Sequence, residues 1–452
     1  MIINDEPDYG LVKKELDSVG CGFCLAKWTQ VTMHLGLGIT HSCHHVGAHK
    51  IPLDELATNP SALHNTNFKK QIRKEMLAGK RPDECDYCWR IEDNTNNFSD
   101  RITKSSKKWS VVDKDKIIVS TGDENIYPRY VEVSFSNVCN FKCTYCGPAF
   151  SSKWTEEIKS NGPYKLKNNH YNAIKETEIP ILAREENPYI EAFWKWFPDA
   201  VKHMQVFRIT GGEPLLSKHT NRVIQYLIDN PQPNLDFAIN SNACPPDAVW
   251  KEFVISIKNL EETNSIKSFE LYTSAESVKG QAEYSRDGMD WKVFNANIRY
   301  FLENTSNIKV CFMSAFNILS LPTIPKYVRH IEKLKRGFDE RVTMDFAYVR
   351  HPEFLDIKIA TEELIETYLK TTIDYMIIRR RKNKRFQPQE ISKLERIYND
   401  CMARFKKNDN VTLDRIRFVQ FVNEYDRRRN KNFLKTFPEY KEFYKLCENS
   451  NV

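Results

Sequence analysis

Apolar strand-like segments and helix-length segments alternate from about residue 130 to residue 350, and this alternation limits the fold more than any other feature. Six segments rich in β-branched and aromatic residues are predicted strands, and the intervals between them are long enough for helices. The predicted strands span 130–135, 205–210, 236–240, 268–273, 308–316 and 342–349. Such alternation is typical of an α/β fold with a parallel sheet and crossover helices. We therefore predict a partial (β/α)6 barrel with its functional site at the carboxyl ends of the strands.

The chain on either side of the predicted barrel differs from it in composition. A polar, lysine-rich connector over 100–116 follows a cysteine-rich N-terminal segment, and beyond about residue 360 the chain is charged, with the apolar spacing of helices. The interval 147–204 is predicted to be an insertion that shapes a substrate entrance. We predict three regions, a small N-terminal domain over 1–110, the barrel over 125–355 and a helical C-terminal extension over 356–452.

Composition is that of an ordinary globular protein. Of the 452 residues 41% are hydrophobic and 28% are charged, and no apolar run approaches the ~20 residues of a membrane-spanning helix. The first ten residues lack the basic and apolar parts of a signal peptide. We therefore expect a cytoplasmic, reducing location and no membrane, so that the twelve cysteines are thiols or metal ligands.

Two basic runs, 379–385 and 426–431, carry much of the basic charge of the C-terminal quarter. Such runs are usually solvated faces or ends of helices, although they also occur in proteins that bind nucleic acid or acidic partners. No RNA-binding pattern is interleaved with them. Nucleic acid is therefore not the partner that we expect.

Three cysteines lie within eight residues just after the first predicted strand. Cys139, Cys143 and Cys146 form a C-x3-C-x2-C motif, a spacing that lets one loop direct three thiolates at one face of an iron–sulfur cubane. The alternatives are a structural zinc loop or three ordinary thiols. Zinc sites, however, favour C-x2-C pairs and four protein ligands.

A second motif, ITGGEP, covers the end of the second predicted strand and the loop after it. Gly211 and Gly212 allow close approach of the backbone to a ligand, and Glu213, followed by Pro214, offers a carboxylate and main-chain acceptors to an ammonium group. Either motif alone would be weak evidence. Their pairing on successive strand ends strongly favours one functional site.

Over about residues 130–350 the chain resembles the radical S-adenosylmethionine (SAM) enzymes, through these two motifs. The resemblance implies a [4Fe-4S] cluster on Cys139, Cys143 and Cys146, whose open iron chelates the amino and carboxylate groups of SAM. Cleavage of SAM by the reduced cluster would yield a 5'-deoxyadenosyl radical. By the same resemblance, Tyr145 lies against the adenine and the Gly211–Pro214 loop binds the methionine ammonium.

The resemblance implies three further SAM contacts. Asn242 follows the third predicted strand, Ser274 follows the fourth, and Arg286 lies in a Tyr-x-Arg-x-Gly-x-x-Trp-like stretch of peptide-modifying members. Asn242 and Ser274 would contact SAM, and Arg286 would pair with its carboxylate. The alternative for each is a capping or surface polar group.

The N-terminal cysteines form a second pattern. Cys24 is followed by thirteen residues, Gly38, four more residues and then Cys43, a C-x13-G-x4-C pattern. Cys85 and Cys88 form a C-x2-C pair. This spacing resembles the auxiliary-cluster half-motif of the SPASM/twitch branch of radical SAM enzymes, although that domain normally follows the barrel. It implies an auxiliary [4Fe-4S] cluster on all four cysteines, which would carry electrons.

Other ligands for this N-terminal centre stay open. The same four thiolates can instead build a tetrahedral zinc site. Cys21 can replace Cys24, and nearby histidines either ligate or are ordinary loop residues. These histidines are His41, His44, His45 and His49.

The sequence thus predicts a radical SAM enzyme that abstracts hydrogen from a carbon of a peptide or protein, with the auxiliary cluster relaying electrons and a donor such as flavodoxin or ferredoxin. One alternative is radical SAM oxidation or rearrangement of a small metabolite; another is a non-catalytic iron–sulfur or zinc protein that binds nucleic acid. No catalytic acid or base is assigned. Loop residues expected near the site are Glu276, Glu283, Asn317, Arg350 and His351.

Overall fold

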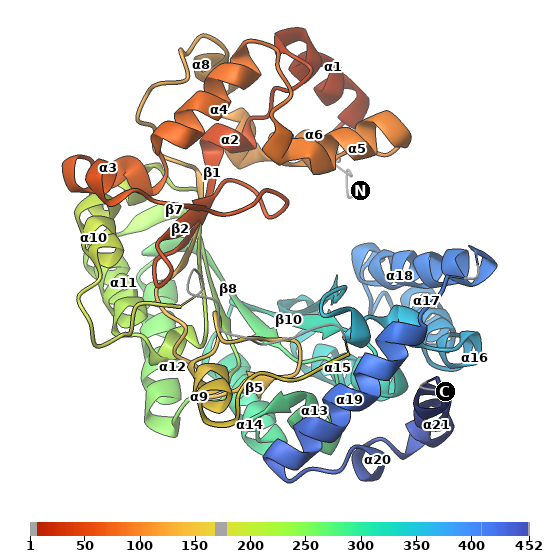
Figure 1. Cartoon of the computed structure of the whole chain (residues 1–452). Coiled ribbons are helices and arrows are strands. Elements are labelled where there is room, and N and C mark those ends of the chain that lie inside the picture. The colour runs from red at the N-terminus through yellow and green to blue at the C-terminus, as the bar shows by residue number, and fades with distance from the viewer. Residues whose placement is uncertain (1–6, 168–178, 408, 451–452) are drawn as a thin grey trace.

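The computed structural model describes residues 7–167, 179–407 and 409–450. Its core is a mostly parallel sheet of nine strands in the order β11-β10-β8-β7-β6-β4-β1-β2-β3 (Figure 1). All six predicted strands are confirmed and lie side by side in this sheet. They are β4 (Tyr130–Ser134), β6 (Val206–Thr210), β7 (Gln232–Ser241), β8 (Ile266–Ser274), β10 (Lys309–Phe316) and β11 (Val342–Tyr348).

The sheet is longer than the six strands predicted from the sequence, because the N-terminal region adds three more. β1 (Gln30–His34) pairs in parallel with β4, and β2 (Ile39–His41) and β3 (His49–Lys50) follow as antiparallel neighbours. These strands are only two to five residues long. Strands this short carry too little alternation to be recognised, and β1 finds its parallel partner a hundred positions away, with Gln30 opposite Tyr130.

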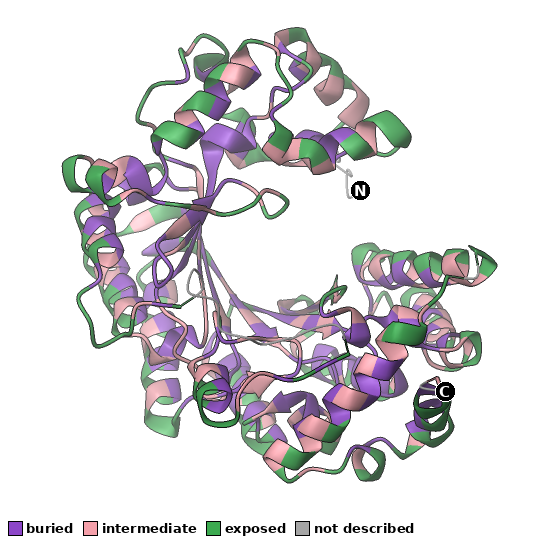
Figure 2. Cartoon of the chain, viewed as in Figure 1, coloured by how far each residue is buried: buried purple, intermediate pink, exposed green. Residues whose placement is uncertain are grey.

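Helices cover the outer face of the sheet and bury its apolar side chains (Figures 1 and 2). In β6, Phe207 and Ile209 are buried beneath these helices, whereas Arg208 and Thr210 alternate with them on the opposite face. The outer helices are α10 (Pro188–Ala200), α11 (Lys218–Asp229), α12 (Asp247–Glu262), α14 (Trp291–Asn304) and α15 (Ile324–Phe338).

The N-terminal region divides its apolar residues between two cores. Val31 and Met33 of β1 belong to the main core of the sheet, whereas Leu16, Trp28 and Ile102 belong to a second, smaller core. The smaller core packs among α1 (Tyr9–Val19), α2 (Ala26–Thr29), α4 (Asn67–Leu77), α6 (Asp100–Ser105) and α8 (Lys114–Ile118). The N-terminal region is therefore continuous with the sheet and not joined to it by the connector alone. The three proposed domain boundaries stay predictions.

The C-terminal extension is helical, as predicted, and lies beside the far end of the sheet (Figure 1). Its main helices are α17 (Thr371–Asn383), α18 (Pro388–Lys407), α19 (Thr412–Arg429) and α21 (Lys441–Asn449). Among the described residues, no helix has the length and apolar character needed to cross a membrane.

Candidate functional site

The three-cysteine loop leaves the carboxyl end of β4 and is fixed by a short ribbon. Cys143 ends β5 (Lys142–Cys143), which pairs antiparallel with β9 (Arg286–Asp287). The indole N–H of Trp154 donates to the carbonyl oxygen of Cys143 at 2.8 Å, and the Ser151 hydroxyl donates to the carbonyl oxygen of Phe141 at 2.7 Å. These bonds hold the cysteine loop in one backbone conformation.

The Gly211–Pro214 loop lies directly against the cysteine loop, at the carboxyl end of the neighbouring strand β6. The main-chain N–H of Glu213 donates to the carbonyl oxygen of Val138 at 2.7 Å. Gly211 has a φ of +125°, and a Cβ atom on Gly212 would lie 2.3 Å from that same carbonyl oxygen. Only glycine permits this approach. The structure therefore brings the two sequence motifs together.

Glu213 joins this loop to the end of β7. Its buried carboxylate accepts hydrogen bonds from the Leu215 N–H at 3.0 Å, the Ser241 hydroxyl at 2.9 Å and the Asn242 N–H at 2.6 Å. Burial raises the pKa of Glu213 to about 7, although these hydrogen bonds oppose the rise. The Asn242 side-chain amide in turn donates to Asn140 of the cysteine loop at 2.7 Å. Asn242 thus contacts both the Gly211–Pro214 loop and the cysteine loop.

Arg286 is buried next to the cysteines, with an acidic partner that is also buried. Its Nε donates to Glu276 at 2.9 Å, and its Nη1 lies 3.7 Å from Sγ of Cys143. The Tyr145 hydroxyl donates to the same carboxylate at 3.2 Å, and the Arg286 guanidinium lies 5.5 Å from the Tyr145 ring centroid. Tyr145, Arg286 and Cys143 therefore gather around Glu276. Ser274 ends the adjacent strand β8 at the same edge of the sheet.

The three thiols are partly buried and lie close to one another. Burial and the neighbouring Cys143 together raise the pKa of Cys139 to about 12. The pKa of Cys146 is raised by burial and by both other cysteines, so the three sulfurs are close electrostatic neighbours. A bound cation is therefore needed to hold them as thiolates. Within the described ranges, no three His, Cys, Asp or Glu side chains gather closely enough for one metal ion.

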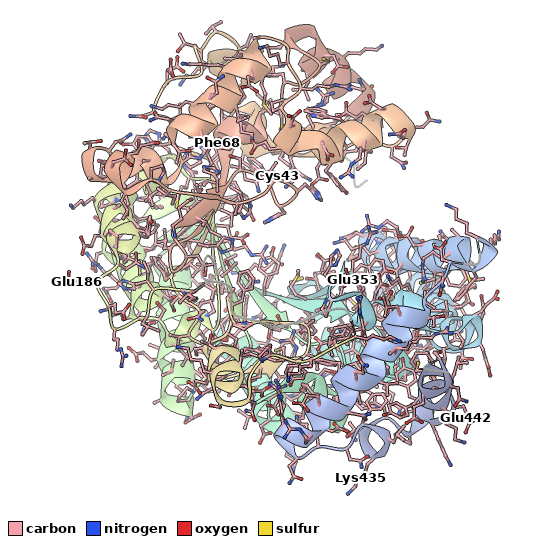
Figure 3. All side chains as sticks on the ribbon, in the orientation of Figure 1. Cys43, Phe68, Glu186, Glu353, Lys435 and Glu442 are labelled. Atoms are coloured by element: carbon pink, nitrogen blue, oxygen red, sulfur yellow. The ribbon has the colours of Figure 1, made fainter. Side chains whose placement is uncertain are left out.

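The four predicted N-terminal ligands, Cys24, Cys43, Cys85 and Cys88, line one cavity. Burial, with a contribution from the neighbouring Cys24, raises the pKa of Cys85 and of Cys88 to about 12. Cys43 follows β2, on the edge of the N-terminal region (Figure 3). Lys104 donates from Nζ to Sγ of Cys43 at 3.3 Å. A cation thus faces this group of sulfurs.

The alternative ligands near this cavity differ in position. Cys21 is exposed, is not among the cavity-lining residues and lies 3.4 Å from the carbonyl oxygen of Gly79. His45 lines the cavity, but its Nε2 pairs with Asp100 at 3.0 Å. His41 lies 2.9 Å from the carbonyl oxygen of Cys43 through Nδ1, and His49 lies 3.0 Å from the Thr66 hydroxyl through Nε2. Of the cysteines considered, Cys24 rather than Cys21 faces the other three.

The loop residues expected near the site have other partners in the structure. Asn317 is buried and accepts from the Leu319 N–H at 2.8 Å within its own turn. The exposed Arg350 and His351 pair with Asp400 and Glu353, respectively. Glu283 accepts from the N–H of Trp291 at 3.0 Å. Only Glu276 of this group contacts Arg286 and Tyr145.

Sequence reasoning missed two residues that contact the cysteine regions. Lys104 lies in a lysine-rich stretch that is predicted to be a connector, and Arg429 lies in a basic run of the kind that usually forms a solvated helix end. Arg429 donates to the carbonyl oxygen of Lys142, one residue before Cys143, at 2.8 Å. The only sequence feature that pointed to Arg429 was a basic run next to apolar and aromatic residues.

Comparisons with known proteins leave the function to be argued from the site. No known protein-family model and no curated protein matches the chain. Among solved structures it is similar to the X-ray structure of the FeFe-hydrogenase maturase HydG from Carboxydothermus hydrogenoformans, with 12% identity and a TM-score of 0.27 over 86% of this chain and 95% of that chain. A TM-score this low supports no argument about fold or chemistry.

Proposed function

We propose that the chain is a radical SAM enzyme. The observation that carries the proposal is the contact between the C-x3-C-x2-C loop after β4 and the GGEP loop after β6. The main-chain N–H of Glu213 donates to the carbonyl oxygen of Val138, and Gly212, which has no Cβ, allows the two backbones to approach this closely. Parallel strands place ligand sites at their carboxyl ends, where these loops meet. Neither a zinc staple nor a binding module requires this pairing.

In this proposal Cys139, Cys143 and Cys146 hold a [4Fe-4S] cluster. When bound, the cluster and SAM supply reductive cleavage of SAM to a 5'-deoxyadenosyl radical. The side chains of Tyr145, Asn242 and Ser274 and the Gly211–Pro214 loop would orient SAM. Because Arg286 already pairs with Glu276, it would share its charge between that carboxylate and the carboxylate of SAM.

We assign a second cluster, an auxiliary [4Fe-4S], to Cys24, Cys43, Cys85 and Cys88. Their shared cavity supports this assignment, as does the cation beside Cys43. With four cysteine ligands such a cluster would have no open iron and would relay electrons. Zinc on the same thiolates is the competing assignment, and metal analysis separates the two.

The substrate we favour is a peptide or protein side chain, with a small polar metabolite as the alternative. Polar side chains on the face of the sheet opposite the helices support a polar substrate. Arg208 donates to Asn240 at 2.8 Å, and its guanidinium lies 4.1 Å from the Tyr272 ring centroid. Nucleic acid is a weaker candidate, because Arg428 and Arg429 of the basic run are only 2% and 1% exposed.

The test is metal analysis, electron paramagnetic resonance and 5'-deoxyadenosine formation on anaerobically reconstituted protein, reduced by dithionite or by flavodoxin. The parent should carry about eight irons, and Cys139→Ala/Cys143→Ala/Cys146→Ala should carry about four and lose SAM cleavage. The exposed Cys21→Ala is the matched control and should behave like the parent. SAM cleavage that survives in the triple variant would overturn the proposal.

A further inference from the structure

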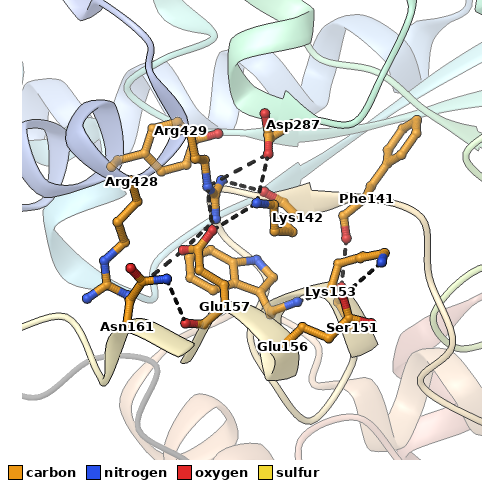
Figure 4. Close-up of polar contacts among 12 residues, drawn as sticks. Phe141, Lys142, Ser151, Lys153, Glu156, Glu157, Asn161, Asp287, Arg428 and Arg429 are labelled. Atoms are coloured by element: carbon orange, nitrogen blue, oxygen red, sulfur yellow. Dashed lines mark hydrogen bonds and ion pairs between the residues drawn. The ribbon is translucent and has the colours of Figure 1, made fainter. Parts of the chain in front are cut away.

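The end of helix α19 reaches from the C-terminal extension to the cysteine loop (Figures 1 and 4). Three consecutive arginines end this helix, but they differ sharply in exposure. The side chain of Arg427 is 64% exposed, whereas those of Arg428 and Arg429 are 2% and 1% exposed. Burial of two guanidinium groups is costly unless each is paired, so their contacts are informative.

Arg429 donates hydrogen bonds to two separate segments, one within the cysteine loop and one after it. Its Nη1 donates to the carbonyl oxygen of Lys142 at 2.8 Å, and its Nε donates to Glu157 at 2.9 Å. Its guanidinium lies 3.9 Å from the ring centroid of Tyr425 and 4.6 Å from that of Trp154. Trp154 is the residue whose indole N–H donates to the Cys143 carbonyl. Arg429 thus contacts the backbone before Cys143 and the ring that supports the backbone after it.

The same network also reaches the ribbon strand that carries Arg286. Lys142 pairs with Glu157 at 2.9 Å and with Asp287 at 3.3 Å (Figure 4). Lys431 also pairs with Asp287, at 2.7 Å. Asp287 is the partner of Lys142 in the β5–β9 ribbon. Arg429 at the end of α19 and Lys431 in the turn after it therefore contact both strands of the ribbon.

The charges in this network do not balance. Arg428 pairs with Glu424 at 2.7 Å, but the three other cations, Lys142, Arg429 and Lys431, share two anions, Glu157 and Asp287. Arg286 and its partner Glu276 add one charge of each sign. The excess positive charge lies beside the loop that would hold an anionic cluster. Attraction of this kind is strong where both charges are away from water.

We propose that Arg429 is a positioning residue of the metal centre, which fixes the Cys143 backbone and supplies positive charge to the cluster. The inference rests on the proposed function, and it makes the C-terminal extension part of the active site. Loss of the charge should lower the midpoint potential of the cluster at this site, since a nearby cation favours the more negative, reduced state. Loss of the hydrogen bonds should loosen the loop and speed release of iron.

The experiment compares Arg429→Met, Arg429→Lys and the exposed control Arg427→Met in the full chain. Iron release to a chelator is followed by absorbance, midpoint potentials by electron paramagnetic resonance, and folding by circular dichroism. We expect Arg429→Met to release iron about tenfold faster and to lower one midpoint potential, with the N-terminal centre unchanged. Arg429→Lys keeps the charge and should keep the potential while still releasing iron faster. Arg427→Met should match the parent.

The outcomes separate the inference from the function on which it rests. If the parent carries the cluster and cleaves SAM, but Arg429→Met and Arg427→Met match in iron release and potential, the positioning role is wrong. If the parent binds no iron at the three-cysteine loop after reconstitution, the proposed function itself fails. Should Arg429→Met not fold, a parent-like rate of iron release in Arg429→Lys with an unchanged circular dichroism spectrum would overturn the role of the hydrogen bonds, and a changed midpoint potential in that variant would overturn the role of the charge.

Discussion

Nη1 of Arg286 lies 3.7 Å from Sγ of Cys143, while Nε of the same side chain donates to the buried carboxylate of Glu276. Removal of Arg286 would leave that carboxylate unpaired in the interior. We expect Arg286→Met to lower the free energy of unfolding of the metal-free protein by about 3–5 kcal/mol. Urea denaturation measures it. Arg286→Met/Glu276→Leu removes both charges and should regain most of the loss; equal losses in the two variants would contradict this explanation.

Gly212 should tolerate no side chain. A Cβ atom would lie 2.3 Å from the carbonyl oxygen of Val138, so Gly212→Ala has to separate the two loops of the site. We expect a loss of about 1–3 kcal/mol in unfolding free energy together with lower iron content and less 5'-deoxyadenosine. In Gly337→Ala, the matched control in helix α15, the new Cβ meets nothing within 4 Å. Parent-like iron content in Gly212→Ala would show that close contact of the loops is unnecessary.

Lys104 should raise the midpoint potential of the N-terminal centre. Its Nζ donates to Sγ of Cys43 at 3.3 Å, and such a charged donor stabilises a more reduced cluster. Lys104→Met is expected to lower the midpoint potential of that centre alone, as measured by electron paramagnetic resonance during redox titration. Lys107→Met, an exposed neighbour, is the control. A centre with no redox signal and stoichiometric zinc would instead establish the structural alternative.

His330 gives a pH dependence that is independent of any metal. Burial lowers its pKa from 6.5 to about 4, and its ring lies 5.1 Å from that of Trp291. Between pH 6.5 and pH 4 the unfolded chain binds more protons at this residue than the folded chain, so stability falls as the pH falls. The difference in unfolding free energy between His330→Phe and the parent should therefore depend on pH. It should favour His330→Phe by about 1–2 kcal/mol more at pH 5 than at pH 7. Parallel pH profiles for the two proteins would contradict it.

The elements with strong local patterns could be predicted from the sequence. All six predicted strands are apolar segments bounded by helix-length intervals, and each lies where the pattern placed it. The two loop motifs could be paired because parallel strands bring their carboxyl ends to one edge. The contact itself, through Gly212 and Val138, depends on backbone geometry that no spacing reveals.

The rest of the site depends on contacts between segments far apart in the chain. Glu157 and Arg429 are separated by 272 residues, and Cys43 and Lys104 by 61. A charged residue in an amphipathic helix is usually solvated, so nothing local distinguishes Arg429 from the exposed Arg427. Burial, which only the folded chain defines, separates them.

The parallel pairing of β1 with β4 also bears on how the protein is made. During synthesis β1 emerges a hundred residues before its partner, since Gln30 lies opposite Tyr130, and until then its Val31 and Met33 lack the main core. The nascent N-terminal region therefore cannot complete its fold on the ribosome before β4 emerges. A gene fragment that ends near residue 110 would encode an unfinished sheet edge, and one that begins there would leave β4 exposed to pairing with other chains.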